Sequence, residues 1–165
     1  MSQVEVVRKI SNYLQVPAGN LSQSREKVVT RTLDDKTKVS GFCTVVSSLA
    51  GKYRSVEEEC LTRQWLEYCS LYVNSTCLEG NRSHQRSVLE ELNEYLATRS
   101  YFVGNSLSLA DVAVFYSIAT TVETLQNSDK EHFVHLSRWF DHVQLTDSVR
   151  QDMSLVNFSS LRSVR

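Results

Sequence analysis

Ser108 and Asp111 are the side chains whose types and spacing most readily suggest chemistry. A serine hydroxyl close to a carboxylate could act as a nucleophile, but serine needs an adjacent base, such as histidine, to become nucleophilic. No histidine lies near these two residues in the sequence. The same spacing defines a capping box, in which each side chain accepts a hydrogen bond from the backbone amide of the other residue. We therefore interpret the pair as the structural start of a helix.

The residues around this pair predict a helix that is buried on nearly all sides. Leu107 precedes the cap and Val112 occupies the fourth helical position, so the two can form a hydrophobic staple. Few strongly polar side chains follow as far as Thr120. A surface helix would show a polar face, so this helix is expected to lie at the centre of its domain.

Three histidines, His132, His135 and His142, raise the question of a metal site. Ten residues of helix span about 15 Å, whereas a zinc ion lies about 2 Å from each histidine nitrogen. One ion cannot reach all three side chains along one helix. We therefore expect a surface or partner-facing role for these histidines and no metal site.

The composition excludes several other classes of function. The chain has 165 residues, 41% of them hydrophobic, and a net charge of −1, so we expect neither nucleic acid nor a membrane among its partners. No apolar run has the length of a membrane span, and the first residues lack the core of a signal peptide. The cysteines show no CxxC pair and no metal-ligand spacing, which favours reduced thiols and no cofactor. They are Cys43, Cys60, Cys69 and Cys77.

Hydrophobic periodicity divides the chain into a short mixed unit and a longer helical part. The mixed unit, residues 1–53, is too small to stand alone. Its predicted elements are a helix (4–14), a loop (17–25), two strands (27–33 and 37–39) and a helix (41–52) capped by Ser40.

Residues 54–165 are predicted to be helical, except for a tail that either packs on the domain or lies free. Two further capping boxes are predicted, at Ser55 with Glu58 and at Ser128 with Glu131. The predicted core positions of the last long helix are Phe133, Leu136, Phe140 and Val143, with Trp139 beside them; a short helix follows at 147–153, and the tail (155–165) carries Val156, Phe158 and Leu161.

The helical part resembles the C-terminal domain of glutathione transferases, and more narrowly the elongation factor 1 epsilon type of that superfamily. The matching residues are Gln64-Trp65-Leu66-Glu67-Tyr68; Leu92-Asn93 with Tyr95-Leu96; Gly104 with Leu109-Ala110-Asp111 and Tyr116; and Ser137-Arg138-Trp139-Phe140 with His142 and Gln144. The resemblance implies a mostly α fold. It consists of a glutathione-transferase-like C-terminal helical domain (54–165) and a reduced thioredoxin-like α/β N-terminal unit (1–53).

The resemblance also implies that the glutathione site is missing. Glutathione transferases bind the cysteinyl part of glutathione beside a cis-proline before a strand, and cis peptide bonds are essentially confined to proline. Pro17 is the chain's one proline, and Val28 and Val29 stand where the cis-proline would be needed. Gly41 and Phe42 occupy the helix start that would hold the γ-glutamyl group. Function must be argued from the site and not from the fold, so we expect no enzyme.

Protein binding is the remaining class of function. The resemblance implies a non-catalytic adaptor of the multi-aminoacyl-tRNA synthetase complex, which docks onto methionyl-tRNA synthetase and bridges it to glutamyl-prolyl-tRNA synthetase, among other transferase-like domains. The resembled family is cytoplasmic and is also found in the nucleus. Two surfaces would bind these partners: one with Val46, Leu49, Ala50, Arg63 and Glu67, and the other with Arg138.

Three alternatives stay open. A small glutathione-dependent transferase would share the fold, and binding to a glutathione resin would identify it. A membrane-organelle adaptor of the metaxin kind would need a C-terminal anchor, for which the tail is too polar. A homodimeric structural protein would be revealed by gel filtration.

Overall fold

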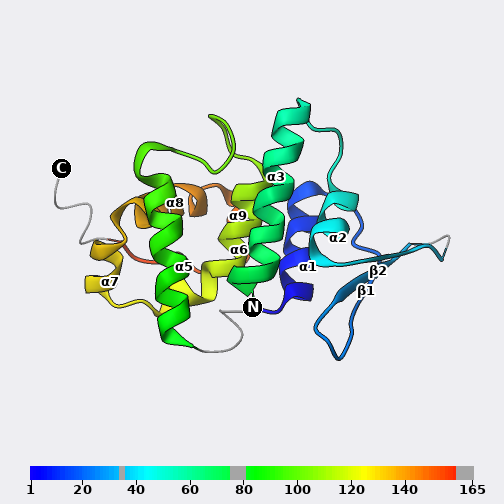
Figure 1. The fold of residues 1–165 in the computed structure, drawn as a ribbon, viewed down its shortest axis with the longest axis horizontal. Coiled ribbons are helices and arrows are strands. Elements are labelled where there is room, and N and C mark those ends of the chain that lie inside the picture. Colours follow the sequence, from blue (N-terminus) through cyan, green and yellow to red (C-terminus); the bar gives the residue numbers. More distant parts are fainter. Residues whose placement is uncertain (34–35, 75–80, 159–165) are drawn as a thin grey trace.

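The computed structural model describes residues 1–33, 36–74 and 81–158. Most of these residues are helical, and one small sheet lies near the N-terminus (Figure 1). In chain order the elements are α1 (Gln3–Leu14), β1 (Asn20–Gln23), β2 (Val29–Thr32), β3 (Lys38–Ser40), α2 (Phe42–Leu49), α3 (Val56–Tyr68), the π-helix η1 (Cys69–Val73), α5 (Arg82–Tyr95), the 3₁₀-helix η2 (Leu96–Thr98), α6 (Leu109–Thr124), α7 (Asn127–His132), α8 (Val134–Gln144) and α9 (Asp147–Arg150). None of the helices within the described ranges combines the length and the apolar composition that crossing a membrane would require.

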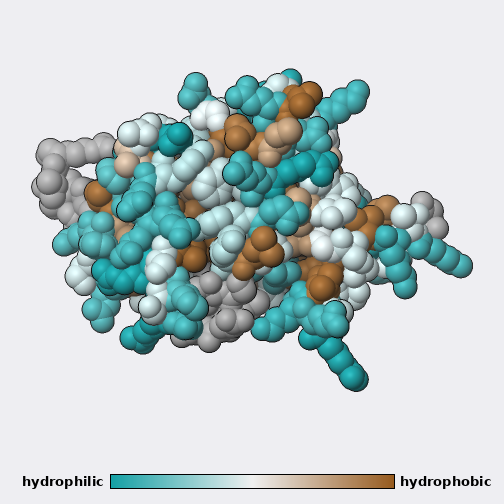
Figure 2. Space-filling view, in the orientation of Figure 1, coloured by the Kyte–Doolittle hydropathy of each residue, from teal (hydrophilic) through white to brown (hydrophobic). Residues whose placement is uncertain are grey.

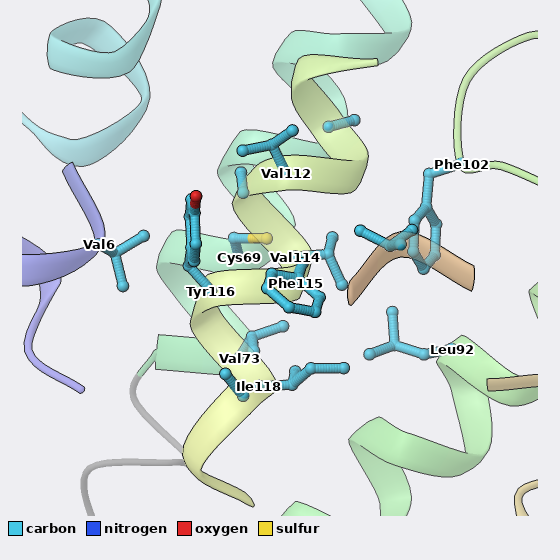
Figure 3. Close-up of a cluster of buried hydrophobic side chains, with 14 of the residues drawn as sticks. Val6, Cys69, Val73, Leu92, Phe102, Val112, Val114, Phe115, Tyr116 and Ile118 are labelled. Atoms are coloured by element: carbon cyan, nitrogen blue, oxygen red, sulfur yellow. The ribbon is translucent and has the colours of Figure 1, made fainter. Parts of the chain in front are cut away.

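Helix α6 lies at the centre, as the sequence predicts. Every residue from Ala110 to Ala119 is buried, and α6 packs against α1, α3, η1 and α8. Figure 3 shows side chains from these neighbours, such as Val6 of α1 and Cys69 of η1, converging on α6. A helix surrounded in this way needs no polar face, which explains its continuous run of apolar residues.

The N-terminal unit forms a three-stranded antiparallel sheet in the order β1-β2-β3. Helix α1 contacts β1, α2 and α6, so one hydrophobic core joins this unit to the helical part. In Figure 1 the strands project from one end of the molecule, and α7 lies at the other. The sequence predicts the overall class correctly, a mostly α fold with a reduced α/β unit.

A buried arginine ties the sheet to its surroundings. Arg31 of β2 is 6% exposed. Its guanidinium donates to the carbonyls of Ala18 and Pro17, each at 2.9 Å, and to Ser48 Oγ at 3.0 Å. A buried charge is costly unless hydrogen bonds satisfy it, so these contacts fix the loop before β1 and the end of α2 relative to β2.

Two predictions in the N-terminal unit are wrong. Residues 20–23 form β1, although their composition indicates a loop, because pairing with β2 supplies their backbone hydrogen bonds. Ser40 belongs to β3, where its hydroxyl lies 3.0 Å from Thr30 Oγ1. The N-cap of α2 is Gly41, whose φ of +95° favours glycine, and no side chain caps this helix.

The two other predicted capping boxes are incomplete or absent. Ser55 caps α3 by accepting a hydrogen bond from the Glu58 amide, but the Glu58 carboxylate accepts from the Arg54 amide instead of from Ser55. Ser128 caps no helix, because the N-cap of α7 is Gln126, two residues earlier, and Ser128 is already the second residue of the helix. The chain then bends at Phe133 (ψ +52°), which separates α7 from α8.

The tail packs on the domain as far as Phe158. The Gln144 side chain donates to the Val156 carbonyl and accepts from its amide, each at 2.9 Å. Phe158 is 2% exposed and faces Phe140, with 6.0 Å between ring centroids. Leu161 lies outside the described residues.

The Asp111 carboxylate connects the entry of α6 to its surroundings. Both hydrogen bonds of the predicted capping box with Ser108 are present. The carboxylate also accepts from the Phe102 amide and from Trp139 Nε1, each at 2.9 Å. Burial raises the pKa of Asp111, and the hydrogen bonds from Ser108, Phe102 and Trp139 oppose that rise.

Replacing this carboxylate should be strongly destabilising. We expect Asp111→Ala to lower the free energy of unfolding by about 3–5 kcal/mol, because it leaves several buried donors without an acceptor. Urea unfolding followed by circular dichroism measures the change. Glu123→Ala, at an exposed position of the same helix, is the matched control and should change stability by less than about 0.5 kcal/mol. Equal effects of the two substitutions would contradict the role given to Asp111.

Candidate functional site

The first predicted partner surface lies where α2 meets α3, but two of its predicted residues do not reach it. Val46 and Leu49 are 0% and 2% exposed and belong to the core. They lie on the face of α2 that packs inward, so neither side chain is available to a partner. Ala50 is half-buried, and Arg63 and Glu67 are exposed.

Different α2 side chains accompany Arg63 and Glu67. Cys43 and Ser47, one turn apart on α2, lie on the side that faces α3, and Tyr53 in the connector between the helices lies beside Ser47, Arg63 and Glu59. We call this group the α2–α3 surface: Ser47, Ala50, Tyr53, Glu59, Arg63 and Glu67, with the buried Cys43 beneath them. Cys43, Ser47 and Tyr53 are not among the residues predicted for this surface. The i, i+4, i+7 spacing of positions 43, 47 and 50 is the signal that could have found the α2 members.

Charge on the α2–α3 surface is partly paired. Arg63 Nη2 lies 2.9 Å from Glu59 Oε1 one turn earlier on α3, and this contact raises the pKa of Arg63. Glu67 lies beside the Cys43 thiol, whose Sγ also contacts the Arg63 carbonyl at 3.9 Å. Burial and the neighbouring Glu67 carboxylate raise the pKa of Cys43 to about 11. Cys43 therefore stays protonated at neutral pH and is not a nucleophile.

The second predicted surface lies on α8. Arg138 is exposed, while the neighbouring Trp139 and Phe140 are each 1% exposed, as the sequence predicts. The Arg138 guanidinium is nevertheless held in place, because Nη2 donates to the carbonyls of Leu96 at 2.9 Å and Arg99 at 3.1 Å. An arginine beside the carbonyls at the end of a helix is electrostatically favourable. Arg138 therefore fixes the segment after α5 as well as facing outward.

Three more side chains extend the α8 surface beside Arg138. His135 precedes Arg138 by three residues, His142 and Leu145 follow it at helical spacing, and Leu145 is 56% exposed. The Tyr101 hydroxyl lies 2.9 Å from His142 Nε2 and joins the loop before α6 to this surface. We call the group of His135, Arg138, His142, Leu145 and Tyr101 the α8 surface.

The three histidines considered for a metal site, His132, His135 and His142, lie on two helices and not on one. His132 belongs to α7, where its Nε2 lies 3.8 Å from Glu90 of α5. His135 and His142 belong to α8, and the bend at Phe133 separates them from His132.

Two hydrogen bonds donated by α8 to an α5 side chain explain one of the sequence matches. Asn93 Oδ1 accepts from the amides of His135 and Leu136, at 2.9 and 3.1 Å. These amides lie in the first turn of α8, where no helical partner exists. Asn93 thus positions the start of the α8 surface.

The two described thiols of this region should differ sharply in reactivity. Because its raised pKa of about 11 leaves little thiolate at pH 8, we expect iodoacetamide to modify Cys43 at least about 100-fold more slowly than the exposed Cys60. Cys43 modification should accelerate as the pH approaches 11. Peptide mapping by mass spectrometry separates the sites, and a Cys60→Ser variant controls for cross-labelling. Equal rates at pH 8 would contradict the burial and charge assigned to Cys43.

Comparison with known proteins gives a consistent family. A family model described as nuclear-export cofactor Arc1p (Arc1p N-terminal-like) matches residues 58–147. The chain is 29% identical over 146 residues to eukaryotic translation elongation factor 1 epsilon-1 of Cricetulus griseus, covering 83% of this chain and 81% of that protein. The Homo sapiens protein of the same name is 26% identical over 144 residues, with the same coverage.

A second kind of relative is a synthetase. The chain is 30% identical over 135 residues to the bifunctional glutamate/proline–tRNA ligase of Cricetulus griseus, which covers 79% of this chain but 8% of the ligase. The similarity therefore concerns one small part of a large enzyme. The family model spans more than half of the chain, so the chain belongs to the Arc1p N-terminal-like family and is a protein of the elongation factor 1 epsilon type.

Proposed function

We propose that this chain is a non-catalytic adaptor of translation that binds transferase-like domains of aminoacyl-tRNA synthetases. The observation that carries the proposal is the double similarity of one stretch of chain. Most of the chain is similar to 81% of elongation factor 1 epsilon-1 and to 8% of the glutamate/proline–tRNA ligase of Cricetulus griseus. When domains of one fold pair with each other, a few side chains at the interface can decide which partner each domain binds.

Two synthetases are the proposed partners. The similarity to the glutamate/proline–tRNA ligase supports glutamyl-prolyl-tRNA synthetase. The proposal of methionyl-tRNA synthetase as a partner rests on the family resemblance of the helical part. We place this bridging role in the cytoplasm and, as in the resembled family, also in the nucleus.

The placement of potential glutathione-site residues supports a binding role over a transferase. A transferase presents a catalytic Tyr, Ser or Cys on a loop after its first strand, whereas Ser11 and Tyr13, the hydroxyl side chains nearest in sequence, lie within α1, and Ser11 is 2% exposed. Gly41, at the start of α2, offers no side chain that could hold a γ-glutamyl group. Val29, which stands where a transferase would need its cis-proline, is completely buried in β2.

The two surfaces could bind two partners at once. The α2–α3 surface lies at the junction of the proposed units 1–53 and 54–165, whereas the α8 surface lies within the second unit. Figure 1 draws α2 and α8 on opposite sides of α3. We therefore propose one surface for each synthetase.

Reciprocal substitutions test this arrangement. We expect Arg138→Ala to weaken binding of one synthetase domain by about 2 kcal/mol, the range of an interface hot spot, and to leave the other unchanged. Arg63→Ala should show the reverse preference, with a smaller loss. Purified synthetase domains titrated by isothermal calorimetry give both affinities, and each variant serves as the control for the other.

The loss of contacts within the chain must be separated from the loss of partner contacts. Because Arg138 also holds the Leu96 and Arg99 carbonyls, thermal unfolding of each variant is measured beside binding. Wild-type affinity of both variants for both synthetases would remove these surfaces from the proposal. Failure of the wild-type chain to bind either synthetase, with specific elution from a glutathione resin, would replace the adaptor by a transferase.

A further inference from the structure

A cleft of about 730 Å³ lies between the outer side of α1 and the segment formed by Ser148, Gln151 and Asp152 at the end of α9. Clefts that bind small molecules have volumes of roughly 300–1,000 Å³, so this one has the size of a ligand site. None of the described residues that line it belongs to the α2–α3 surface or to the α8 surface. The adaptor function proposed above therefore leaves the cleft without a role.

Hydrogen bonds and an ion pair hold the two walls of the cleft together. Gln151 Nε2 donates to the Lys9 carbonyl of α1 and to the Tyr116 hydroxyl of α6, each at 2.8 Å. The Lys9 ammonium also pairs with the Asp152 carboxylate. Gln151 has φ +53° and ψ −125°, a backbone conformation that a residue with a side chain keeps only where its surroundings hold it. The cleft is therefore preformed, as small-molecule sites usually are.

One cation in the cleft has no counter-charge. Lys9 is paired with Asp152, and the Glu5 carboxylate accepts a backbone hydrogen bond at the start of α1. Arg8 is exposed, and no carboxylate in the part of the chain that the structure describes lies within ion-pair distance of it. A guanidinium group matches a carboxylate in a bidentate contact. Because Glu5 and Asp152 would repel a second negative charge, a monocarboxylate suits the cleft better than a dianionic phosphate.

Tyr13 adds an aromatic ring and a hydroxyl group further along the same wall. It is half-buried, and its hydroxyl has no hydrogen-bond partner among the described residues. Burial and, to a lesser extent, the Asp111 carboxylate raise the pKa of Tyr13, so at neutral pH the hydroxyl is protonated and can donate. Tyr13 follows Arg8 by five residues, an axial distance of about 7.5 Å in a helix. A molecule that reaches both residues is about as long as a phenol with a short acidic side chain.

We propose that the cleft between α1 and α9 binds a small aromatic monocarboxylic acid. Its carboxylate contacts Arg8, its ring packs on Tyr13, and a polar group at the far end of the ring accepts a hydrogen bond from the Tyr13 hydroxyl. On the face seen in Figure 2 the hydrophobic side chains form small separate patches, so that face offers no broad apolar area to an aromatic ligand. The inference does not depend on the proposed function, because the cleft shares no described residue with the two synthetase surfaces.

Two probes that differ in charge alone test the class of ligand. They are para-hydroxyphenylpropionate and its neutral amide, para-hydroxyphenylpropionamide. In proton–nitrogen NMR titrations of the whole chain, we expect the acid to shift the amide signals of α1 and of residues 148–152. Its shifts should saturate with a Kd of about 1 mM, which the small number of ligand atoms allows. The neutral amide should bind at least about tenfold more weakly, because it lacks the charged partner of Arg8.

Three variants locate the contacts of the ligand. Arg8→Gln removes the charge but keeps a long polar side chain, and we expect it to raise the Kd of the acid at least about tenfold. Tyr13→Phe keeps the ring and removes the hydroxyl, and it should raise the Kd about threefold. Arg25→Gln is the matched control, because it makes the same exchange at an exposed arginine in the turn between β1 and β2. It should bind the acid like the wild type.

Several outcomes would contradict the proposal. Shifts that do not saturate, or that spread over other elements, would show that the cleft is no binding site. Equal affinities for the acid and the amide, or an unchanged affinity of Arg8→Gln, would remove the carboxylate contact. Phenyl phosphate, titrated under the same conditions, is expected to bind more weakly than the acid; tighter binding would replace the carboxylic acid by a phosphate ligand.

Discussion

The buried Asp111 carboxylate is the contact on which the arrangement of the helical part depends. A carboxylate without exposure to water must have its oxygens occupied by donors. The donors come from three places: the Ser108 cap, the Phe102 amide in the preceding loop and the Trp139 indole on α8. One residue at the start of the central helix therefore fixes a loop and a second helix relative to it.

The aromatic side chains carry this constraint outward to the surface. Phe102, held at its amide by Asp111, lies with its ring centroid 4.5 Å from that of Trp65 on α3 and 5.0 Å from that of Trp139 on α8. The Tyr95 hydroxyl of α5 donates to the Phe102 carbonyl at 3.0 Å. Because Trp139 is buried in this cluster, its neighbour Arg138 faces the other way, toward solvent and the Leu96 carbonyl. The orientation of the α8 surface follows from the core beneath it.

Local signals account for what could be predicted from the sequence. The Ser108–Asp111 box and the burial of α6 are encoded within a few residues, so one sequence suffices to find them. The side of α2 that faces the core, in contrast, cannot be predicted from its sequence. This helix has eight residues, most of them apolar, so periodicity does not say whether Val46 or Ser47 faces outward. Packing against α1, α3 and the sheet decides it. Likewise, β1 needs its partner β2 in order to be recognised, and the Trp139–Asp111 bond joins residues far apart in the chain.

The α2–α3 surface and the α8 surface differ in how far their side chains can be substituted without affecting the fold. Arg138 is exposed on the surface proposed for a partner and also holds two backbone carbonyls, so any replacement alters the segment after α5 together with the proposed contact. Arg63 pairs with Glu59 on its own helix, Glu67 lies beside Cys43 of α2, and the Arg63–Glu59 pair is exposed. Exposed pairs of this kind can be exchanged at small cost to folding. In the proposed adaptor, partner choice can therefore diverge through Arg63 and Glu67 while α8 keeps its sequence, because replacing Arg138 also removes its contacts with the Leu96 and Arg99 carbonyls.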